Sequence, residues 1–499
     1  MDTIALVSSP SRAHSRRPPL ALMTIAAYLE RHGFNAEILD FKIKSYTPLK
    51  NVSAENFIIE KILSRLEKMN PLAVALTAFS HEIESTIALA SLIKSRTKSF
   101  VIVGGNHATY YPNHFLYKGS PVDFVVIGEG EVTFTDLLKA LSGKKKPDSV
   151  QSIAFFKSGK IIKTPQRDLI QNLDDLPIPA FEKVDMAFYT KPHLYGIRYL
   201  PLSIFYVFTT RGCPWVCTFC SIPDIWKHNK GIRRIRYKSA NAVADEVETL
   251  VKKYGVDAIY FFDDDFCVWR QRVIDMCNEF KKRQIDFLWG CETRVDEIDD
   301  ELARIMSEAG CIQIDFGVES GSQKMLDTID KRTTVAQNLE AFRLCKKHGI
   351  RTFANLMFNL PGETVQDVEE TVSMAKEINA TVYSIGSLTP FPGSEIFKQL
   401  KLNLEVKDFS VYREATHGED SFRLANHNLD LTKLVADTMR SVNRPFSTFR
   451  EKRAFMKYMK KVARARRKKD YTISFIRLTH FALTSRIPRV LKGRLSPYK

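Results

Sequence analysis

The stretch Thr210-Arg-Gly-Cys213-Pro-Trp-Val-Cys217-Thr-Phe-Cys220 places three thiols within eight residues, at the spacing C-x3-C-x2-C. Three thiolates on one short loop can bind three irons of a 4Fe–4S cluster, which leaves the fourth iron without a protein ligand. That open iron can bind the amino and carboxylate groups of a small molecule. The alternative is a structural zinc loop, for which His228 could supply the fourth ligand. The remaining cysteines stand singly among apolar neighbours, as is typical of buried thiols: Cys267, Cys277, Cys291, Cys311 and Cys345.

Length and composition favour a large cytoplasmic protein. A chain of 499 residues suggests about two or three domains. The cysteines do not form the paired framework of a secreted protein, so a reducing compartment fits better. Residues 2–8 resemble a first strand more than a signal peptide, because no basic region precedes them. The chain has no uninterrupted apolar run long enough to span a bilayer.

The net charge of +17 is concentrated near the C-terminal end of the sequence. Residues 451–499 contain 16 of the 74 Lys and Arg residues but only 2 of the 57 Asp and Glu residues. A basic run at 457–469 is followed by large apolar side chains, a pattern typical of segments that bind anionic lipids. A solvated helical face and an arginine-rich RNA-binding segment are the alternatives. We therefore expect a basic helical region over 401–499, of which residues 451–499 contact an anionic surface on the inner face of a membrane.

The first 144 residues alternate short apolar runs with amphipathic helical stretches. This alternation predicts an α/β domain with a doubly wound, Rossmann-like parallel sheet. Ligands on such sheets bind at the carboxyl ends of the strands. The predicted helices include 20–31 and 83–94, and the predicted strands are 4–8, 36–39, 73–77, 100–103 and 124–127.

Two loops at these strand ends carry unusual residues, Gly104-Gly105-Asn106-His107 and Gly128-Glu129-Gly130-Glu131. Their glycines let the backbone approach a large flat ligand. With Pro18-Pro19-Leu20 and Asp40, these loops resemble the cobalamin-binding domain that precedes many radical S-adenosylmethionine (SAM) enzymes. The resemblance implies that all eight loop residues contact cobalamin.

The role of His107 stays open at this point. The sequence lacks the Asp-x-His-x-x-Gly motif that supplies a lower cobalt ligand in related domains. His107 could take that place, but a lone loop histidine more often forms hydrogen bonds within its own turn. We therefore expect cobalt without a protein lower ligand.

Residues 145–200 form a predicted linker with a hairpin at Ser158-Gly159. From 201 to 400 the strand–helix alternation resumes, and six such units predict an open, partial (β/α)6, TIM-like barrel. The cysteine loop directly follows the first of these strands, so it should lie at the carboxyl edge. The predicted strands are 204–209, 258–262, 287–291, 313–318, 352–358 and 382–388.

Polar residues follow each of the other five strands, which is more than helix capping explains. Phe219, just before the third cysteine, matches an aromatic common in radical SAM enzymes, and the resemblance to this family covers residues 1–400. It implies that Asp264 contacts the SAM amino group, and that Gly362 packs on adenine. Glu319 and Ser320 match the positions of ribose and carboxylate contacts.

This resemblance implies a 4Fe–4S cluster, SAM and cobalamin as cofactors, with an external electron donor such as flavodoxin or ferredoxin. Reductive cleavage of SAM would give a 5′-deoxyadenosyl radical, followed by methylation of an unactivated carbon, with a lipid or other small hydrophobic substrate expected. An oxidative cyclase of the tetrapyrrole type is the first alternative. An RNA-modifying enzyme is another, but the N-terminal domain lacks a second three-cysteine set, so nucleic acid is not expected. A non-catalytic cobalamin sensor would not need the cysteines.

Overall fold

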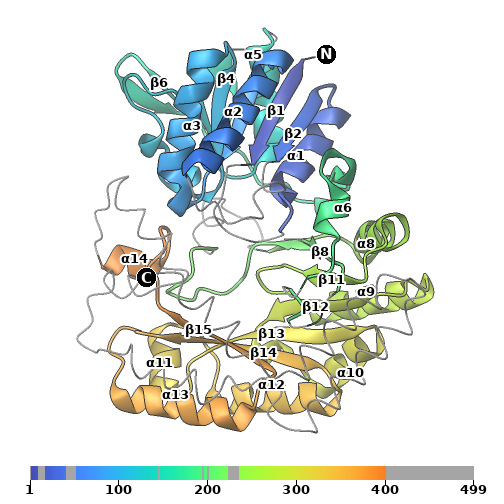
Figure 1. The fold of residues 1–499 in the computed structure, drawn as a ribbon. Coiled ribbons are helices and arrows are strands. Elements are labelled where there is room, and N and C mark those ends of the chain that lie inside the picture. The colour runs from blue at the N-terminus through green and yellow to red at the C-terminus, as the bar shows by residue number, and fades with distance from the viewer. Residues whose placement is uncertain are drawn as a thin grey trace.

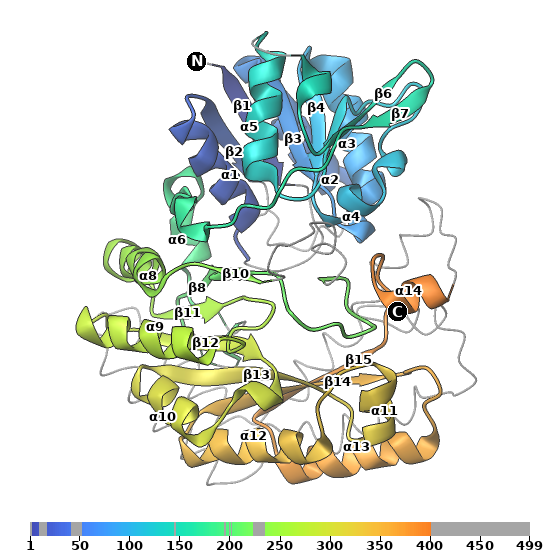
Figure 2. The ribbon, with the colours of Figure 1, turned by 180° about the vertical axis from the view of Figure 1, so that it is seen from behind.

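The computed structural model describes residues 2–8, 17–40, 52–143, 146–193, 196–198, 200, 202–222 and 235–400. Within these ranges, two α/β units are stacked on one another (Figures 1 and 2). His228 and the predicted basic region 401–499 lie outside the described residues, and so does the predicted membrane contact of 451–499.

The N-terminal unit contains a seven-stranded sheet in the order β2-β1-β3-β4-β5-β6-β7. The five strands from β2 to β5 run parallel, as the alternating sequence pattern predicts. They are β1 (Thr3–Ser8), β2 (Asn35–Asp40), β3 (Ala73–Thr77), β4 (Phe100–Gly104) and β5 (Phe124–Val126).

Alternate residues of these strands pack on opposite faces of the sheet. On β1, Ile4 and Leu6 join a core with α1 (Leu20–Arg31) and α5 (Gly130–Leu141). Ala5 and Val7 join the opposite core with α2 (Val52–Met69) and α3 (Ile83–Arg96). The sheet is therefore covered by helices on both faces, which is the doubly wound arrangement.

The hairpin predicted within the linker is part of this sheet. Strand β6 (Ile153–Lys157) pairs antiparallel with β5, and β7 (Lys160–Lys163) pairs with β6. Phe124 and Phe155 are opposite one another, with ring centroids 5.8 Å apart. The hairpin covers the edge of β5 that would otherwise be unpaired.

The second unit contains six parallel strands in the order β15-β14-β13-β12-β11-β8. This order confirms the predicted strand–helix alternation, and β8 and β15 are the outer strands of this sheet. The strands are β8 (Ile204–Val207), β11 (Ala258–Phe261), β12 (Leu288–Thr293), β13 (Cys311–Glu319), β14 (Arg351–Phe358) and β15 (Val382–Ser387).

Helices cover the outer face of this sheet, away from the N-terminal unit (Figure 2). Local sequence sets their ends: Thr334 and Gln337 form a capping box at the start of α12, and Gly255 ends α8 with φ +65°. The main helices of this layer are α8 (Ala240–Tyr254), α9 (Arg270–Lys282), α10 (Asp300–Glu308), α12 (Val335–Lys347) and α13 (Val365–Ile378).

The connector joins the two cores. Phe181 packs edge-on against Phe205 of β8, with centroids 5.5 Å apart, and contacts Tyr254 at the end of α8. Ala180 donates its backbone N–H to the carbonyl of Met23 in α1. Residues 180–181 thus tie both units into one apolar cluster.

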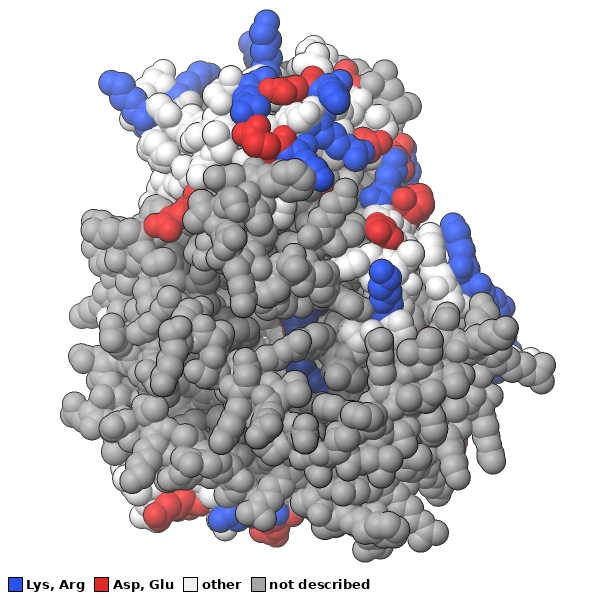
Figure 3. Space-filling view, in the orientation of Figure 1, with Lys and Arg blue, Asp and Glu red and all other residues white. Residues whose placement is uncertain are grey.

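None of the helices within the described ranges is long and apolar enough to cross a membrane. On the described part of the N-terminal unit, acidic and basic side chains are intermixed, as the upper part of Figure 3 shows.

Candidate functional site

The carboxyl edges of the two sheets face one another. The Tyr110 hydroxyl of α4 (Asn106–Tyr110), beyond β4, donates to the carbonyl of Ser221, 2.9 Å away. Glu129, beyond β5, forms an ion pair with Arg211, beyond β8, at 2.6 Å. The loops that the sequence assigned to two different cofactors are therefore in direct contact.

The cysteine loop follows the short strand β9 (Thr210–Arg211) and carries three free, partly exposed thiols. The Trp215 indole N–H donates to Asp265 at 3.0 Å. The backbone N–H of Thr218 donates to the carbonyl of Ile329 at 3.0 Å. The loop is thus held to elements that follow β11 and β13.

Burial raises the pKa of all three thiols, that of Cys220 to about 11. The charges of Lys331 and Arg294 oppose this effect at Cys217. A metal that binds these sulfurs must displace their protons, and nearby cations favour the resulting thiolates. Three free thiols on one loop, with cations beside Cys217, fit the three protein ligands of a 4Fe–4S cluster.

The zinc alternative needs ligands that converge on one ion. Among the described residues, no three His, Cys, Asp or Glu side chains are gathered closely enough to hold a single metal ion. In a 4Fe–4S cluster each thiolate binds a different iron, so the three sulfurs do not have to converge on a single ion.

The three aspartates after β11 have different surroundings. Asp263 is buried and accepts the backbone N–H groups of Thr209 and Thr210, at 2.6 and 2.9 Å. Asp265 is also buried and accepts from Trp215 and from the Thr293 hydroxyl. Both carboxylates therefore shape the cysteine loop.

Asp264 is the most exposed of the three. Loss of hydration of the carboxylate beside the surrounding protein, and next the charge of Asp263, raise the pKa of Asp264 to about 6. Its carboxylate accepts the Gly212 N–H, and its charge acts on the Cys213 and Cys220 thiols. This placement suits the predicted contact with an ammonium group beside the cluster.

Glu319 ends β13 with φ +63° and pairs with the buried Lys331 at 2.8 Å. Burial opposes the charge of Lys331, but Glu319 outweighs it and raises the pKa of the amine. The Lys331 amine also lies 5.9 Å from the centre of the Phe219 ring. Glu319 thus lies near the cysteine loop. A SAM group bound to Glu319 would contact a carboxylate that also pairs with Lys331.

Ser320 and Gly362 differ in how accessible they are to a bound ligand. The Ser320 hydroxyl is fully buried, lies 3.0 Å from the Thr371 hydroxyl and accepts the Ser322 N–H. A contact of Ser320 with SAM stays a prediction, and it would need exchange of these partners. Gly362 is exposed with φ +73° and has open space where a side chain would lie, as packing on a flat base requires.

In the N-terminal unit, Gly105 takes φ +101° and lies against Ala78, where a Cβ would approach the backbone oxygen to 3.1 Å. The glycine therefore serves a close backbone approach within the unit. Gly104 ends β4 and Asn106 begins α4, where its side chain is exposed.

His107 is turned into the N-terminal unit. Its Nδ1 lies 3.0 Å from the Ser80 hydroxyl and its Nε2 lies 3.1 Å from Nδ1 of His114. Burial, and next the neighbouring His114, lower the pKa of His107 to about 3, so the ring is neutral. Both ring nitrogens are engaged by residues of the same unit. Cobalt without a protein lower ligand stays a prediction.

The two carboxylates predicted to contact cobalamin form ion pairs with arginines of the second unit. Glu131 pairs with Arg211 at 2.5 Å, and Glu129 pairs with both Arg211 and Arg236. Burial would raise the pKa of Glu131, but Arg211 lowers it, so the carboxylate is ionised. In the stretch Gly128 to Glu131, the backbone rather than the two carboxylates is left to contact a cofactor.

Sequence reasoning missed the contacts of two side chains beside the cysteine loop, Arg294 and Lys331. Arg294 is buried and lies 3.8 Å from the centre of the Trp215 ring. Its position just after β12 marked it as part of the edge, but the stacking partner was not evident. Lys331 follows no strand directly and carried no local signal.

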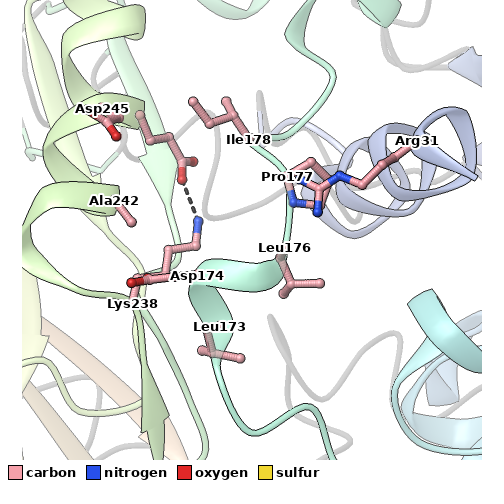
Figure 4. A pocket seen from close by; sticks show the side chains of 10 residues that line it. Arg31, Leu173, Asp174, Leu176, Pro177, Ile178, Lys238, Ala242 and Asp245 are labelled. Carbon is pink, nitrogen blue, oxygen red and sulfur yellow. Dashed lines mark hydrogen bonds and ion pairs between the residues drawn. The ribbon is translucent and has the colours of Figure 1, made fainter.

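A separate cavity of about 210 Å³ lies between the connector and α8 (Figure 4). An ion pair of 2.5 Å between Lys238 and Glu246 crosses it. None of the residues that line it is a predicted site residue.

Two family models match this chain. Residues 207–375 match the radical SAM superfamily, and residues 11–138 match the B12 binding domain. An uncharacterized methyltransferase of Pyrococcus horikoshii is 30% identical over 402 residues, which cover 79% of this chain and 82% of the relative. The chain belongs to the B12-binding radical SAM enzymes. This enzyme therefore uses a 4Fe–4S cluster, SAM and cobalamin, the cofactors of its family.

Other members of the family differ in their reactions. The anaerobic magnesium-protoporphyrin IX monomethyl ester cyclase of Rubrivivax gelatinosus is 30% identical and is matched over 80% of this chain and 69% of its own. The hopanoid C-3 methylase of Methylococcus capsulatus is 25% identical, over 80% and 71%. The solved structure of the methyltransferase TsrM from Kitasatospora setae, with cobalamin and a 4Fe–4S cluster bound, has a TM-score of 0.65 at 19% identity. It covers 80% of this chain and 78% of its own, and shows the same fold.

Proposed function

We propose that this B12-binding radical SAM enzyme methylates an unactivated carbon of its substrate. The observation that carries the proposal is the contact between the cobalamin-domain loops and the cysteine loop, through Tyr110 and Ser221 and through Glu129 and Arg211. A substrate carbon between two adjoining cofactor sites can meet both cofactors without leaving the enzyme. When bound, the cluster and SAM supply the 5′-deoxyadenosyl radical, and methylcobalamin supplies the methyl group.

The chain's own residues bind and orient these groups. Cys213, Cys217 and Cys220 would hold the cluster, and Asp264 would accept the SAM ammonium. Lys331 holds the Glu319 carboxylate in place by their 2.8 Å ion pair. We further propose that a flavodoxin or ferredoxin delivers the electron.

A non-methylating oxidative cyclase is the second candidate, because the magnesium-protoporphyrin ester cyclase is as similar to this chain, at 30%, as the methyltransferase from Pyrococcus. Anaerobic reconstitution with iron, sulfide, cobalamin and SAM, followed by mass spectrometry of the SAM-derived products, separates the two. A methylase forms S-adenosylhomocysteine as well as 5′-deoxyadenosine. A cyclase forms 5′-deoxyadenosine alone, and that result would overturn the proposal.

We propose a lipid or other hydrophobic polycyclic substrate. Two features support this: the concentration of basic residues in 451–499 beside large apolar side chains, and the similarity to a hopanoid methylase. Each basic residue near an anionic lipid surface contributes about 1 kcal/mol of attraction, weakened by salt.

Liposome flotation tests this part of the proposal. The full chain should float with anionic vesicles and less with neutral ones, whereas a version ending at Phe446 should not float. Equal behaviour of the two versions, or preferential binding of RNA, would remove the argument for a lipid substrate.

A further inference from the structure

The loop 128–131, which carries predicted cobalamin contacts, also connects the N-terminal unit to the cysteine loop. Strand β9 pairs antiparallel with β10 (Arg236–Tyr237), which puts Arg211 opposite Arg236. Glu129 and Glu131 bind this pair, with Arg211 contacting both carboxylates at 2.6 and 2.5 Å. The Arg211 side chain is 23% exposed and its partners are below 10%. Water therefore screens these charges only weakly.

The other end of the cysteine loop is held in the same way. Tyr110 donates to the carbonyl of Ser221, the residue directly after Cys220. The Tyr110 ring occupies the space of a missing side chain at Gly393, where a Cβ would lie 2.4 Å from the ring. Arg211 lies two residues before Cys213. The N-terminal unit therefore contacts the cysteine loop at both of its ends.

The loop of Glu129 and Glu131 has a second, free face. Gly128 has φ +74° and no atom where its side chain would lie. It lies beyond β5, at the sheet edge where such domains bind ligands. The backbone can thus face cobalamin while the two carboxylates face the cysteine loop.

We propose that Glu129, Glu131, Arg211 and Tyr110 are positioning residues that couple cobalamin binding to the conformation of the cysteine loop. Cobalamin that orders the backbone at Gly128 also orders the carboxylates that hold Arg211, and hence the segment bearing Cys213. The inference needs only that the N-terminal unit binds cobalamin, and it does not depend on which reaction follows.

Hydrogen–deuterium exchange of the full chain tests this coupling without SAM or substrate. The protein carries its reconstituted cluster, and exchange is compared with and without hydroxocobalamin. Peptides covering 104–112 and 126–134 report cobalamin binding, and a peptide covering 208–222 reports the cysteine loop. In the wild type both regions should gain protection. In Arg211→Gln the first two should still gain it, whereas the gain at 208–222 should fall about tenfold, the effect of one charged hydrogen bond.

Three further variants sharpen the test. Arg211→Lys keeps the charge but loses the two-pronged geometry, so it should fall between wild type and Arg211→Gln. Glu131→Gln keeps the Glu129 pair and serves if Arg211→Gln does not fold. The matched control is Arg167→Gln, which removes a 2.5 Å pair with Asp136 inside the N-terminal unit, with exposures of 24% and 27%. It should behave as wild type.

The outcomes separate the coupling from the cofactor assignment. Unchanged cobalamin-dependent protection at 208–222 in Arg211→Gln or Glu131→Gln, with 126–134 protected, would mean that the ion pairs only hold the units together. Absence of protection at 104–112 and 126–134 in the wild type would overturn the inference together with the predicted cobalamin loops. An EPR spectrum of the reduced cluster that shifts with cobalamin in the wild type but not in Arg211→Gln would support the coupling independently.

Discussion

The second unit contains two groups of cysteines with opposite surroundings. Cys213, Cys217 and Cys220 lie partly exposed on a loop beyond the carboxyl edge of the sheet, with the cations Lys331 and Arg294 beside Cys217. Cys291 is fully buried on the helix-covered face, where the neighbouring thiols Cys267 and Cys311 oppose its ionisation. Burial raises the pKa of Cys291 well above its ordinary value, which keeps this thiol protonated and inert. The surroundings of a thiol, more than the number of thiols, separate metal ligands from core residues.

The largest effect is expected at the partly exposed group. Changing Cys213, Cys217 or Cys220 to Ala should each abolish both the cluster and SAM cleavage, because a 4Fe–4S cluster needs all three protein thiolates. Iron and sulfide analysis and 5′-deoxyadenosine formation measure the two losses. Cys277→Ala and Cys345→Ala should retain both. One fully active variant of the triplet with a normal cluster would break the comparison.

The next effect concerns the carboxylate beside the triplet. Asp264→Asn should raise the Kd for SAM about 10- to 100-fold, because a hydrogen bond to a charged group contributes about 1.5–3 kcal/mol. Calorimetry on the reconstituted protein measures this. Asp275→Asn, on the exposed surface of α9, is the control and should leave the Kd unchanged. Equal affinities for wild type and Asp264→Asn would assign the SAM amine to another partner.

A smaller effect, on stability alone, is expected at the buried group. Cys291→Ala leaves a small void in a packed core and should lower the free energy of unfolding by about 1–2 kcal/mol. Denaturant titration measures the loss, while iron content should equal that of the wild type. Loss of iron from this variant would mean that the core thiols contribute to the cluster.

The smallest effect is expected at His107, which has the buried character of the core thiols. Because both its ring nitrogens are engaged within the N-terminal unit, His107→Ala should retain cobalamin with an unchanged Co(II) EPR spectrum. A nitrogen hyperfine splitting present in the wild type and absent from the variant would show instead that His107 binds cobalt.

Periodicity and turn residues by themselves determined much of this protein's fold. The six strands of the second unit and the position of the cysteine loop after the first follow from local patterns, because burial of one face repeats at fixed intervals along a strand or helix. The same patterns predicted the hairpin at Ser158-Gly159. They did not show that it pairs with β5, because an open strand edge leaves no mark on the sequence of its partner.

Only the tertiary structure decided how the polar side chains are paired. Glu131 and Arg211 are 80 residues apart in the sequence, and so are in contact only once both sheets have formed. Glu319 and Ser320 are neighbours in the chain, yet one pairs with Lys331 and the other is buried against Thr371. A charged or hydroxyl group takes the partner that folding brings within about 3 Å, and that distance depends on how distant segments pack.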